Sequence, residues 1–485
     1  MNDLAVIGLE TAVVAVGLLL LVLDWWTPPE QKRNLGYVAA GAAGLIFLGS
    51  FAVLLPEASS AFGGMYVLDE LALFFKRFFL LAAVLVLLMA VEFADRLETG
   101  ISEFYSLVFF ALAGMMFAAS ANDFALLFVS LELITITFYV LTSFQRRRLQ
   151  SLEAGVKYLI LGALSSALVV YGIALILGAS GTLSFEKLAR ALSESRALEG
   201  SRLLALGLLL VFAGLAFKIA VVPFQVWAPD VYEGSPTPTT AFLAVGSKAA
   251  GIVLLLRLIY LAAPAVTAHW HTLLLVISGL TILYGSLCAI PQRNLKRLMG
   301  YSSIANAGFL LLGIVAHSAA GSAAILYYLG GYLFTVVAAF TVICLASRQV
   351  EGEDIRGLAG LHLRSPLLAV ALAAAMVSLA GVPPLAGFFG KFLLLKAVAA
   401  RAPVDPRLYW LLGVAILGVV ISLYYYFGVI RAIYWAPEPA DLSPIPLSRP
   451  TRVALCFCIG SILWLGVFPN SILNLAEHAV AALRL

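Results

Sequence analysis

Long apolar runs recur along the whole 485-residue chain and constrain its fold more than any other feature. Each run is roughly 20 residues long, which is the length that a helix needs to cross a bilayer and about twice that of a barrel strand. With 62% hydrophobic and only 12% charged residues, the composition excludes a water-soluble domain. The sequence therefore predicts an all-α integral membrane protein.

Proline, glycine and charged residues divide the chain into about fourteen transmembrane spans. We treat residues 1–485 as a single transmembrane domain. The spans are expected near 4–23, 35–55, 71–94, 104–120, 122–144, 154–179, 203–227, 237–261, 271–290, 300–316, 322–347, 366–398, 408–434 and 452–472.

The basic residues predict the orientation of these spans. They gather in the loops that follow odd-numbered spans, and the positive-inside rule makes those loops cytoplasmic. Both termini are then expected on the outer side, where the loop from 178 to 202 contains the pattern LSFEKLARALSES, typical of a short interfacial helix. The basic residues are Lys32, Arg33, Arg146, Arg147, Arg148, Arg293, Lys296, Arg297, Arg348, Arg356, Arg364, Arg449 and Arg452.

Two spans contain signals for a break in the helix. The seventh runs into Pro223 and Pro229, and proline removes a backbone hydrogen bond. The twelfth is interrupted by Gly381-Val382-Pro383-Pro384 and is too long for one straight helix. Interrupted helices at matching places in two halves of a chain favour inverted repeats with an ion site between them.

Two ionisable residues, Glu132 and Lys218, are expected deep in the bilayer. Glu132 lies ten residues past Asn122, or about 15 Å along a helix, and cannot reach the membrane surface. Lys218 follows the apolar run LLALGLLLVFAGLAF and precedes the seventh-span break. A neutral carboxyl and a static ion pair are the structural alternatives, but such residues more often mark proton or ion pathways.

Three further lysines are candidates for the same path. Lys248 lies about 16 Å beyond Thr237 among small residues, and Lys391 follows the twelfth-span break by about two helical turns. Bonding to backbone carbonyls is their structural alternative. Lys157, in the sixth span, lies near the cytoplasmic end, so a side chain extended to the interface competes with a functional role.

Other charged residues and the cysteines carry less weight. Because they lie within about two turns of span ends, six charged residues are expected at the membrane interface. The four cysteines show no metal or cluster spacing, no dinucleotide or nucleotide-binding motif is present, and dispersed basic residues do not favour nucleic acid. No cofactor or metal is thus expected in this chain. The six residues are Glu10, Lys76, Arg77, Glu92, Asp123 and Arg257.

Four segments resemble the subunit N family of respiratory complex I, the proton-pumping NADH:quinone oxidoreductase. The most specific is KIAVVPFQVWAPDVYEGSPTPTTAFLAVGSKAA, which begins at Lys218. The others are SLEL around Glu132, KRLMGYSSIANAGF from Lys296 and GVPPLAGFFGKF from Gly381, in the order that this family has. The resemblance covers the fourth to the thirteenth span.

This resemblance implies fourteen transmembrane helices, inverted repeats of five helices and interrupted seventh and twelfth helices. The corresponding divisions are an N-terminal three-helix segment at 1–103, a first repeat at 104–261, a second at 271–434 and a C-terminal helix at 435–485. The family's proton-path residues fall on Glu132, Lys218, Lys248, Lys391 and Lys157. FMN, iron-sulfur clusters and quinone are implied in partner subunits, and further antiporter-like subunits are implied as neighbours.

Two positions depart from the family pattern, because many relatives have histidine where this chain has Gln225 and Asn306. An amide can relay a hydrogen bond but does not titrate near neutrality.

The resulting hypothesis is a proton-translocating subunit of a bacterial plasma-membrane complex. In this hypothesis Glu132 modulates Lys218, Lys248 is the central proton relay and Lys391 is the distal proton donor. A subunit of a multisubunit cation/proton antiporter is the alternative, and a scaffold with purely structural charges is a third.

Overall fold

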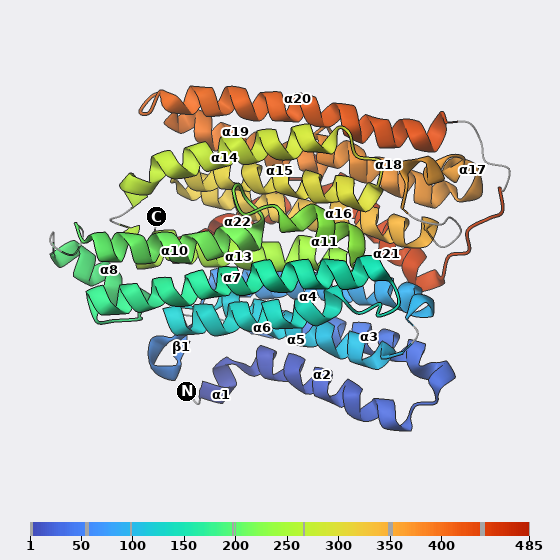
Figure 1. The fold of residues 1–485 in the computed structure, drawn as a ribbon, viewed down its shortest axis with the longest axis horizontal. Helices are drawn as coiled ribbons and strands as arrows, with labels where there is room; N and C mark the ends of the chain where they lie inside the picture. The colour runs from blue at the N-terminus through green and yellow to red at the C-terminus, as the bar shows by residue number, and fades with distance from the viewer. Residues whose placement is uncertain are drawn as a thin grey trace.

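The computed structural model describes residues 3–53, 58–97, 99–195, 198, 200–264, 267–347, 353–436 and 442–484. Nearly all of them are helical, and the long helices run side by side in one bundle (Figure 1). Thirteen helices in the described part are long and apolar enough to cross a membrane. The predicted all-α membrane fold is confirmed.

The spans follow the predicted order closely. The first half holds α2 (Gly8–Trp26), α3 (Leu35–Gly49), α4 (Glu70–Phe93), α5 (Ile101–Ala119), α6 (Phe124–Thr142), α7 (Leu149–Ser180), α10 (Arg202–Ile219) with α11 (Trp227–Gly234), and α12 (Thr237–Phe242) with α13 (Lys248–Arg257). The second holds α14 (Thr267–Ala289), α15 (Leu295–Val315), α16 (Ala319–Ala346), α18 (Pro366–Ala380) with α19 (Ala386–Arg401), α20 (Arg407–Tyr434), and α21 (Arg449–Val467) with α22 (Asn470–Val480).

Smaller elements complete the chain. The short helices α1 (Asp3–Val6) and α17 (Leu361–Arg364) lie at opposite ends of the bundle (Figure 1). The predicted interfacial helix is α8 (Phe185–Glu194), which begins where the Ser184 hydroxyl accepts from the Lys187 amide. An antiparallel hairpin of β1 (Ser59–Ala61) and β2 (Tyr66–Leu68), which the periodicity did not predict, joins α3 to α4.

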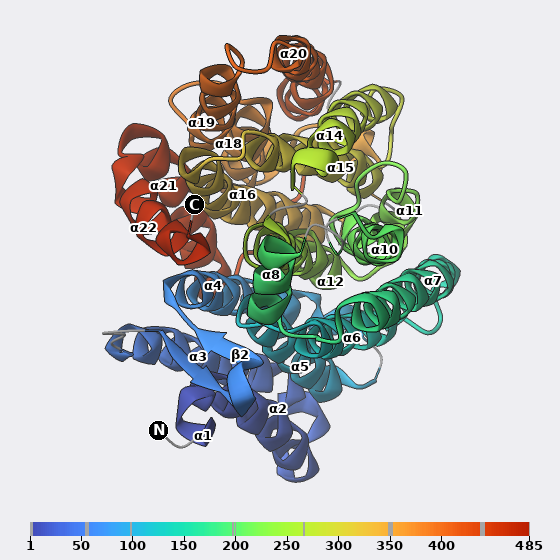
Figure 2. The same cartoon turned by 90° about the vertical axis from the view of Figure 1, so that its left-hand side faces the viewer.

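The helices at the centre of the bundle differ from those at its rim. Every residue of α16 from Gly321 to Ala346 and nearly every residue from Thr237 to Ala262 is buried, whereas α2 and α7 present most of their surface outward. Figure 2 looks along the helices and shows α2 and α3 at one side, α20 at the other and α16 between them. Lys248, the candidate residue on α13, therefore lies in the interior of the bundle.

Both predicted breaks are present and resemble each other. Helix α10 ends at Ala220, whose backbone is left-handed with φ 59°, and α18 ends at Gly381, with φ 82°. A proline with a cis peptide bond follows three residues later in each case, Pro223 and Pro384. A third break, between α21 and α22 at Pro469, divides the last span, for which the sequence predicted one unbroken helix at 452–472.

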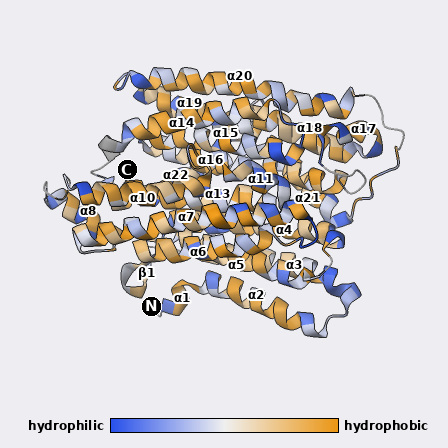
Figure 3. Cartoon of the chain, in the orientation of Figure 1, coloured by the Kyte–Doolittle hydropathy of each residue, from blue (hydrophilic) through white to orange (hydrophobic). Residues whose placement is uncertain are grey.

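The bundle has two distinguishable ends, both rich in hydrophilic residues (Figure 3). One end, which we call the basic end, carries the loops that follow α2, α4, α6, α14, α16 and α20. The predicted basic residues lie there, except that Arg348 is outside the described residues. Figure 1 shows both chain termini at the opposite end, which we call the terminal end.

Five of the six charged residues for which the sequence predicted a position at the membrane interface are enclosed by the protein. Glu10, Lys76, Glu92, Asp123 and Arg257 are all buried. Each has a partner within the protein: Glu10 and Lys76 form an ion pair of 2.8 Å, and Arg257 pairs with Asp69 at 2.7 Å. A position near a span end therefore does not leave these side chains exposed. Arg77 is half-buried and donates to the carbonyl of Ser50 at 3.1 Å.

Candidate functional site

Glu132 lies in the middle of α6, a helix capped by the carboxylate of Asp123, which accepts from the amide of Ala125. The Glu132 side chain is half-buried and accepts a hydrogen bond from the hydroxyl of Ser166 on α7. The helix α6 thus carries a carboxyl group near its midpoint. It faces α7 and α10, which also carry candidate residues.

Lys218 lies opposite Glu132, near the end of α10. Its side chain is 4% exposed, and its ammonium donates to the hydroxyls of Thr135, at 2.9 Å, and Tyr158, at 3.4 Å. The two candidates do not form a direct ion pair; instead both line one cavity of about 20 Å³. A cavity of that size holds about one water molecule. The geometry therefore suits a water-bridged contact.

The helix break beside Lys218 is held by side chains from other elements. The indole of Trp227 donates to the carbonyl of Phe217 at 2.9 Å, and the amide of Val222 donates to the hydroxyl of Thr281 at 3.1 Å. Because backbone groups inside a membrane must find partners within the protein, these bonds allow α10 to end there. The break fixes Lys218 within one turn of the helix end.

Lys248 begins α13, directly after a π-helical turn formed by Leu243–Ser247. π-helical turns inside α-helices often mark functional positions. The Lys248 ammonium donates to the carbonyl of Ser303 at 2.5 Å and to the Ser303 hydroxyl. A Cβ at Gly251, one turn on, would lie 3.5 Å from the stem of Lys218, so the two lysine-bearing helices meet closely here.

Buried hydroxyl and amide groups continue from Lys248 toward the second half of the chain. The Ser303 hydroxyl bonds to those of Tyr232, at 2.9 Å, and Tyr332, at 3.3 Å. The Tyr332 ring stacks on the ring of Tyr328, with centroids 6.1 Å apart. The Tyr328 hydroxyl donates to the Asn306 amide oxygen at 2.6 Å. This row is polar but contains no ionised side chain.

Lys391 lies on α19, just past the second break. It is 3% exposed, and its ammonium donates to the carbonyl of Leu379 at 2.6 Å, one of the groups that the end of α18 leaves free. The Lys391 stem crosses Gly381, where a Cβ would lie 3.1 Å from it. The ring of Tyr328 packs against Gly390, the residue before Lys391, so the polar row reaches the vicinity of this lysine.

The three buried lysines share one electrostatic property. Within the described part of the chain, none of Lys218, Lys248 and Lys391 forms an ion pair; their partners are hydroxyls and backbone carbonyls. A buried ammonium without a counter-charge is costly, and such groups in membrane proteins mark proton or ion pathways.

Lys157 has a different environment from the other candidates. Its side chain is 41% exposed and forms ion pairs of 2.6 Å with both Glu153 and Asp230. Asp230 also pairs with Arg297 at 2.6 Å, which makes a partly exposed charge network beside the basic end. The structure therefore does not group Lys157 with the three buried lysines.

Sequence reasoning missed the tyrosines and serines of the polar row. A tyrosine in an apolar helix is ordinary in a sequence, and only the fold shows that Tyr158, Tyr232, Tyr328 and Tyr332 converge on the lysines. Gln225 and Asn306, which stand where many relatives have histidine, differ in their contacts. Asn306 is bonded to Tyr328, whereas the buried Oε1 of Gln225 has no hydrogen-bond partner in the described part of the chain.

Residues 121–422, more than half of the chain, match the family described as the transmembrane part of NADH:quinone oxidoreductase and Mrp antiporters. The chain belongs to this family of antiporter-like membrane proteins. All the candidate residues fall inside the matched region.

Full-length relatives narrow the class to subunit N of NADH-quinone oxidoreductase. The subunit N of Desulforamulus reducens is 38% identical over 100% of this chain and 99% of its own length. A chain of respiratory complex I from Thermus thermophilus with bound aureothin is 33% identical, covers 97% of this chain and 99% of its own, and superposes with a TM-score of 0.78. A chain of the Mrp complex from Dietzia sp. has the same fold at 21% identity, with a TM-score of 0.84 over 100% of this chain and 98% of its own.

Proposed function

We propose that this subunit of NADH-quinone oxidoreductase moves protons through Glu132, Lys218, Lys248 and Lys391. The observation that carries the proposal is the set of three buried lysines whose partners are neutral oxygens. Each ammonium can release its proton without breaking an ion pair. The charge of a neighbouring site and the arrival of water then decide when it does so.

The first step of this path couples Glu132 to Lys218. One bridging water, with two hydrogen bonds of about 2.9 Å at a roughly tetrahedral angle, separates the two charges by about 5 Å. At an effective dielectric constant of about 20, they attract each other by roughly 3 kcal/mol, which corresponds to about two pKa units. A change at Glu132 is therefore large enough to decide whether Lys218 holds its proton.

The later steps run from Lys248 toward Lys391. Ser303 accepts from the Lys248 ammonium and is bonded in turn to Tyr232 and Tyr332, and hydroxyls can both accept and donate protons. Tyr328 and Asn306 extend this polar row. In our proposal, water molecules join the row to Lys391, and Lys157 contributes from the basic end by holding Asp230 and Glu153 in place.

The similar breaks at Ala220 and Gly381 support two inverted repeats, at 104–261 and 271–434, between a three-helix segment at 1–103 and a last helix at 435–485. The basic end is then cytoplasmic and both termini face the periplasm of a bacterial inner membrane. FMN, iron-sulfur clusters and quinone belong to partner subunits in this proposal, which also has further antiporter-like subunits as neighbours.

A matched pair of lysines on α19 tests the proposal. Lys391 is buried and Lys396 is exposed on the same helix. In the intact complex reconstituted into vesicles, Lys391→Ala should strongly reduce NADH-driven proton pumping, and Lys396→Ala should leave it unchanged. Equal, normal pumping by both variants would refute the path.

The intact complex also separates this function from its alternatives. Co-purification with flavin and iron-sulfur subunits supports the oxidoreductase, whereas cation-dependent transport without them supports a cation/proton antiporter. A structural scaffold would tolerate neutral replacements of the buried lysines.

A further inference from the structure

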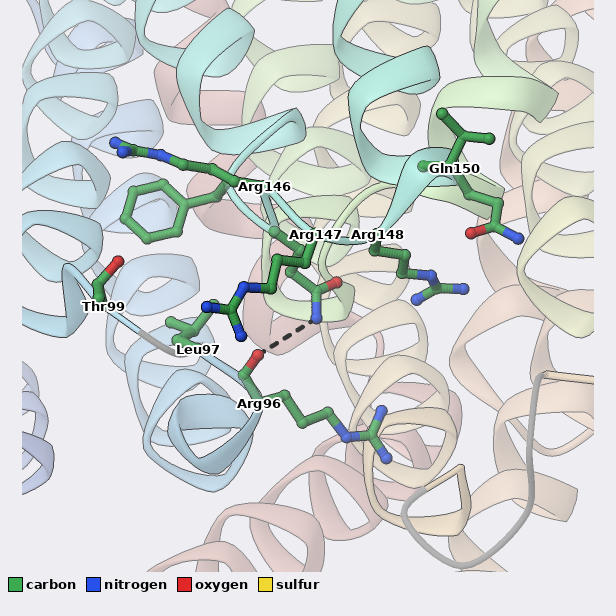
Figure 4. A pocket seen from close by; sticks show the side chains of 10 residues that line it. Arg96, Leu97, Thr99, Arg146, Arg147, Arg148 and Gln150 are labelled. Carbon is green, nitrogen blue, oxygen red and sulfur yellow. Dashed lines mark hydrogen bonds between the residues drawn. The ribbon is translucent and has the colours of Figure 1, made fainter.

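A cavity of about 610 Å³ lies at the basic end, away from the proton path. It opens between the end of α4, the start of α5 and the loop that joins α6 to α7. Figure 4 shows the side chains that line it, with the guanidinium of Arg147 beside Arg96 and Leu97. Four of the ten lining residues are arginines, namely Arg96, Arg146, Arg147 and Arg148.

The described lining of this cavity is basic. None of the ten lining residues is acidic. Arg148 pairs with Glu353 at 3.2 Å and Arg96 donates to Ser347 at 3.1 Å, so these two are held by contacts outside the cavity. Arg146 and Arg147 are exposed. The remaining lining supplies the polar side chains of Thr99, Gln145 and Gln150.

The loop that carries the arginines has a defined shape. The Gln145 amide donates to the Arg96 carbonyl at 3.4 Å, which ties the loop to the end of α4 (Figure 4). The amide of Arg148 donates to the Gln145 carbonyl at 3.1 Å, which closes a turn just before α7. The arginines are thus presented from a turn that is anchored at both sides.

The cavity lies at the ends of two helices long and apolar enough to cross a membrane, since α6 ends at Thr142 and α7 begins at Leu149. Leu149 lines the cavity and is 75% exposed. An outward apolar stripe continues from it along α7, through Leu152, Val156 and Ile160. The spacing of three and four residues puts these side chains on one face of the helix.

We propose that this cavity binds the phosphodiester headgroup of an anionic phospholipid, with an acyl chain along the exposed stripe of α7. Arginine matches phosphate oxygens through paired hydrogen bonds, and basic pockets at the membrane surface favour anionic lipid headgroups. The adjoining apolar stripe favours a lipid over a free phosphate ion, because a free ion makes no use of it.

Lipid retention by the intact complex tests this proposal. Native mass spectrometry with added cardiolipin or phosphatidylglycerol should show one retained anionic lipid that the double variant Arg146→Gln/Arg147→Gln binds on the order of tenfold or more weakly. The double variant Arg293→Gln/Arg356→Gln is a control, since it removes two exposed charges elsewhere at the basic end. Equal retention by the two double variants would overturn the proposal, and so would displacement of the lipid by millimolar inorganic phosphate.

A second measurement keeps all four arginines. A photo-cross-linking residue at Leu149, in the complex assembled in its native membrane, should yield a phospholipid adduct. A protein adduct from a neighbouring subunit, without lipid, would show that an acidic segment occupies the cavity and would overturn the proposal.

Discussion

Removing the charge of Glu132 should uncouple Lys218 from its controlling neighbour. Glu132→Gln keeps an acceptor for the Ser166 hydroxyl and almost the same volume, so the one-water cavity should survive. The variant loses the attraction between Glu132 and Lys218 across about 5 Å, roughly 3 kcal/mol at a dielectric constant of about 20. This corresponds to about a hundredfold change in the equilibrium between protonated and neutral Lys218.

The assay is NADH-driven acidification of vesicles that contain the intact complex, with quinone reduction measured in parallel. We expect fewer protons per NADH, or turnover slowed together with pumping. The control Glu103→Gln changes an exposed glutamate at the start of α5 and should pump normally. If Glu132→Gln assembles and shows normal turnover and a normal proton ratio, the coupling between these two residues is refuted.

Three further predictions follow from individual contacts. Gly381→Ala should destabilise the subunit by about 1 kcal/mol or more and reduce pumping, because φ is 82° at this residue and the new Cβ would crowd Lys391. Unchanged thermal stability and pumping would contradict this prediction. Lys157→Ala should reduce pumping less than Lys391→Ala, since partly exposed ion pairs contribute about 0–1 kcal/mol; complete loss of pumping would contradict this. Burial opposes ionisation of Glu353, but Lys296 and Arg148 outweigh it and hold the pKa of this loop carboxyl below its usual 4.5. The contribution of Glu353 to stability is therefore present above pH 4.5 and lost in more acidic solution. Glu353→Gln should accordingly weaken the acid dependence of the thermal unfolding temperature. An unfolding temperature with the same pH dependence in the variant and the parent would contradict this.

Much of the fold could be predicted because the bilayer limits the choices. Runs of bilayer length locate helices, and the prolines at 223 and 384 locate both breaks of the inner helices. The break before α22 escaped prediction because the run around Pro469 lies near the chain end and has no matching segment elsewhere. The β1–β2 hairpin escaped because its strands have three residues each, too few for a periodic signal.

The site was predictable to the extent that charge in hydrocarbon is rare. Glu132, Lys218, Lys248 and Lys391 could be found from depth alone. Depth placed Glu10 and Lys76 near span ends, but it did not show that both are buried and pair with each other. Only packing between helices distant in sequence distinguishes a paired charge from an unpaired one, and the same packing gives the tyrosines near Lys248 their place.

The central claim is that protons pass through the interior of this subunit by way of buried amines, and Lys248 is its most direct test. Lys248→Met keeps the length and the apolar stem of the side chain but cannot carry a proton. With the assembled complex in sealed vesicles, we expect NADH-driven proton uptake to fall sharply while the subunit composition stays unchanged. A fully assembled Lys248→Met complex that pumps the normal number of protons per electron would contradict the account.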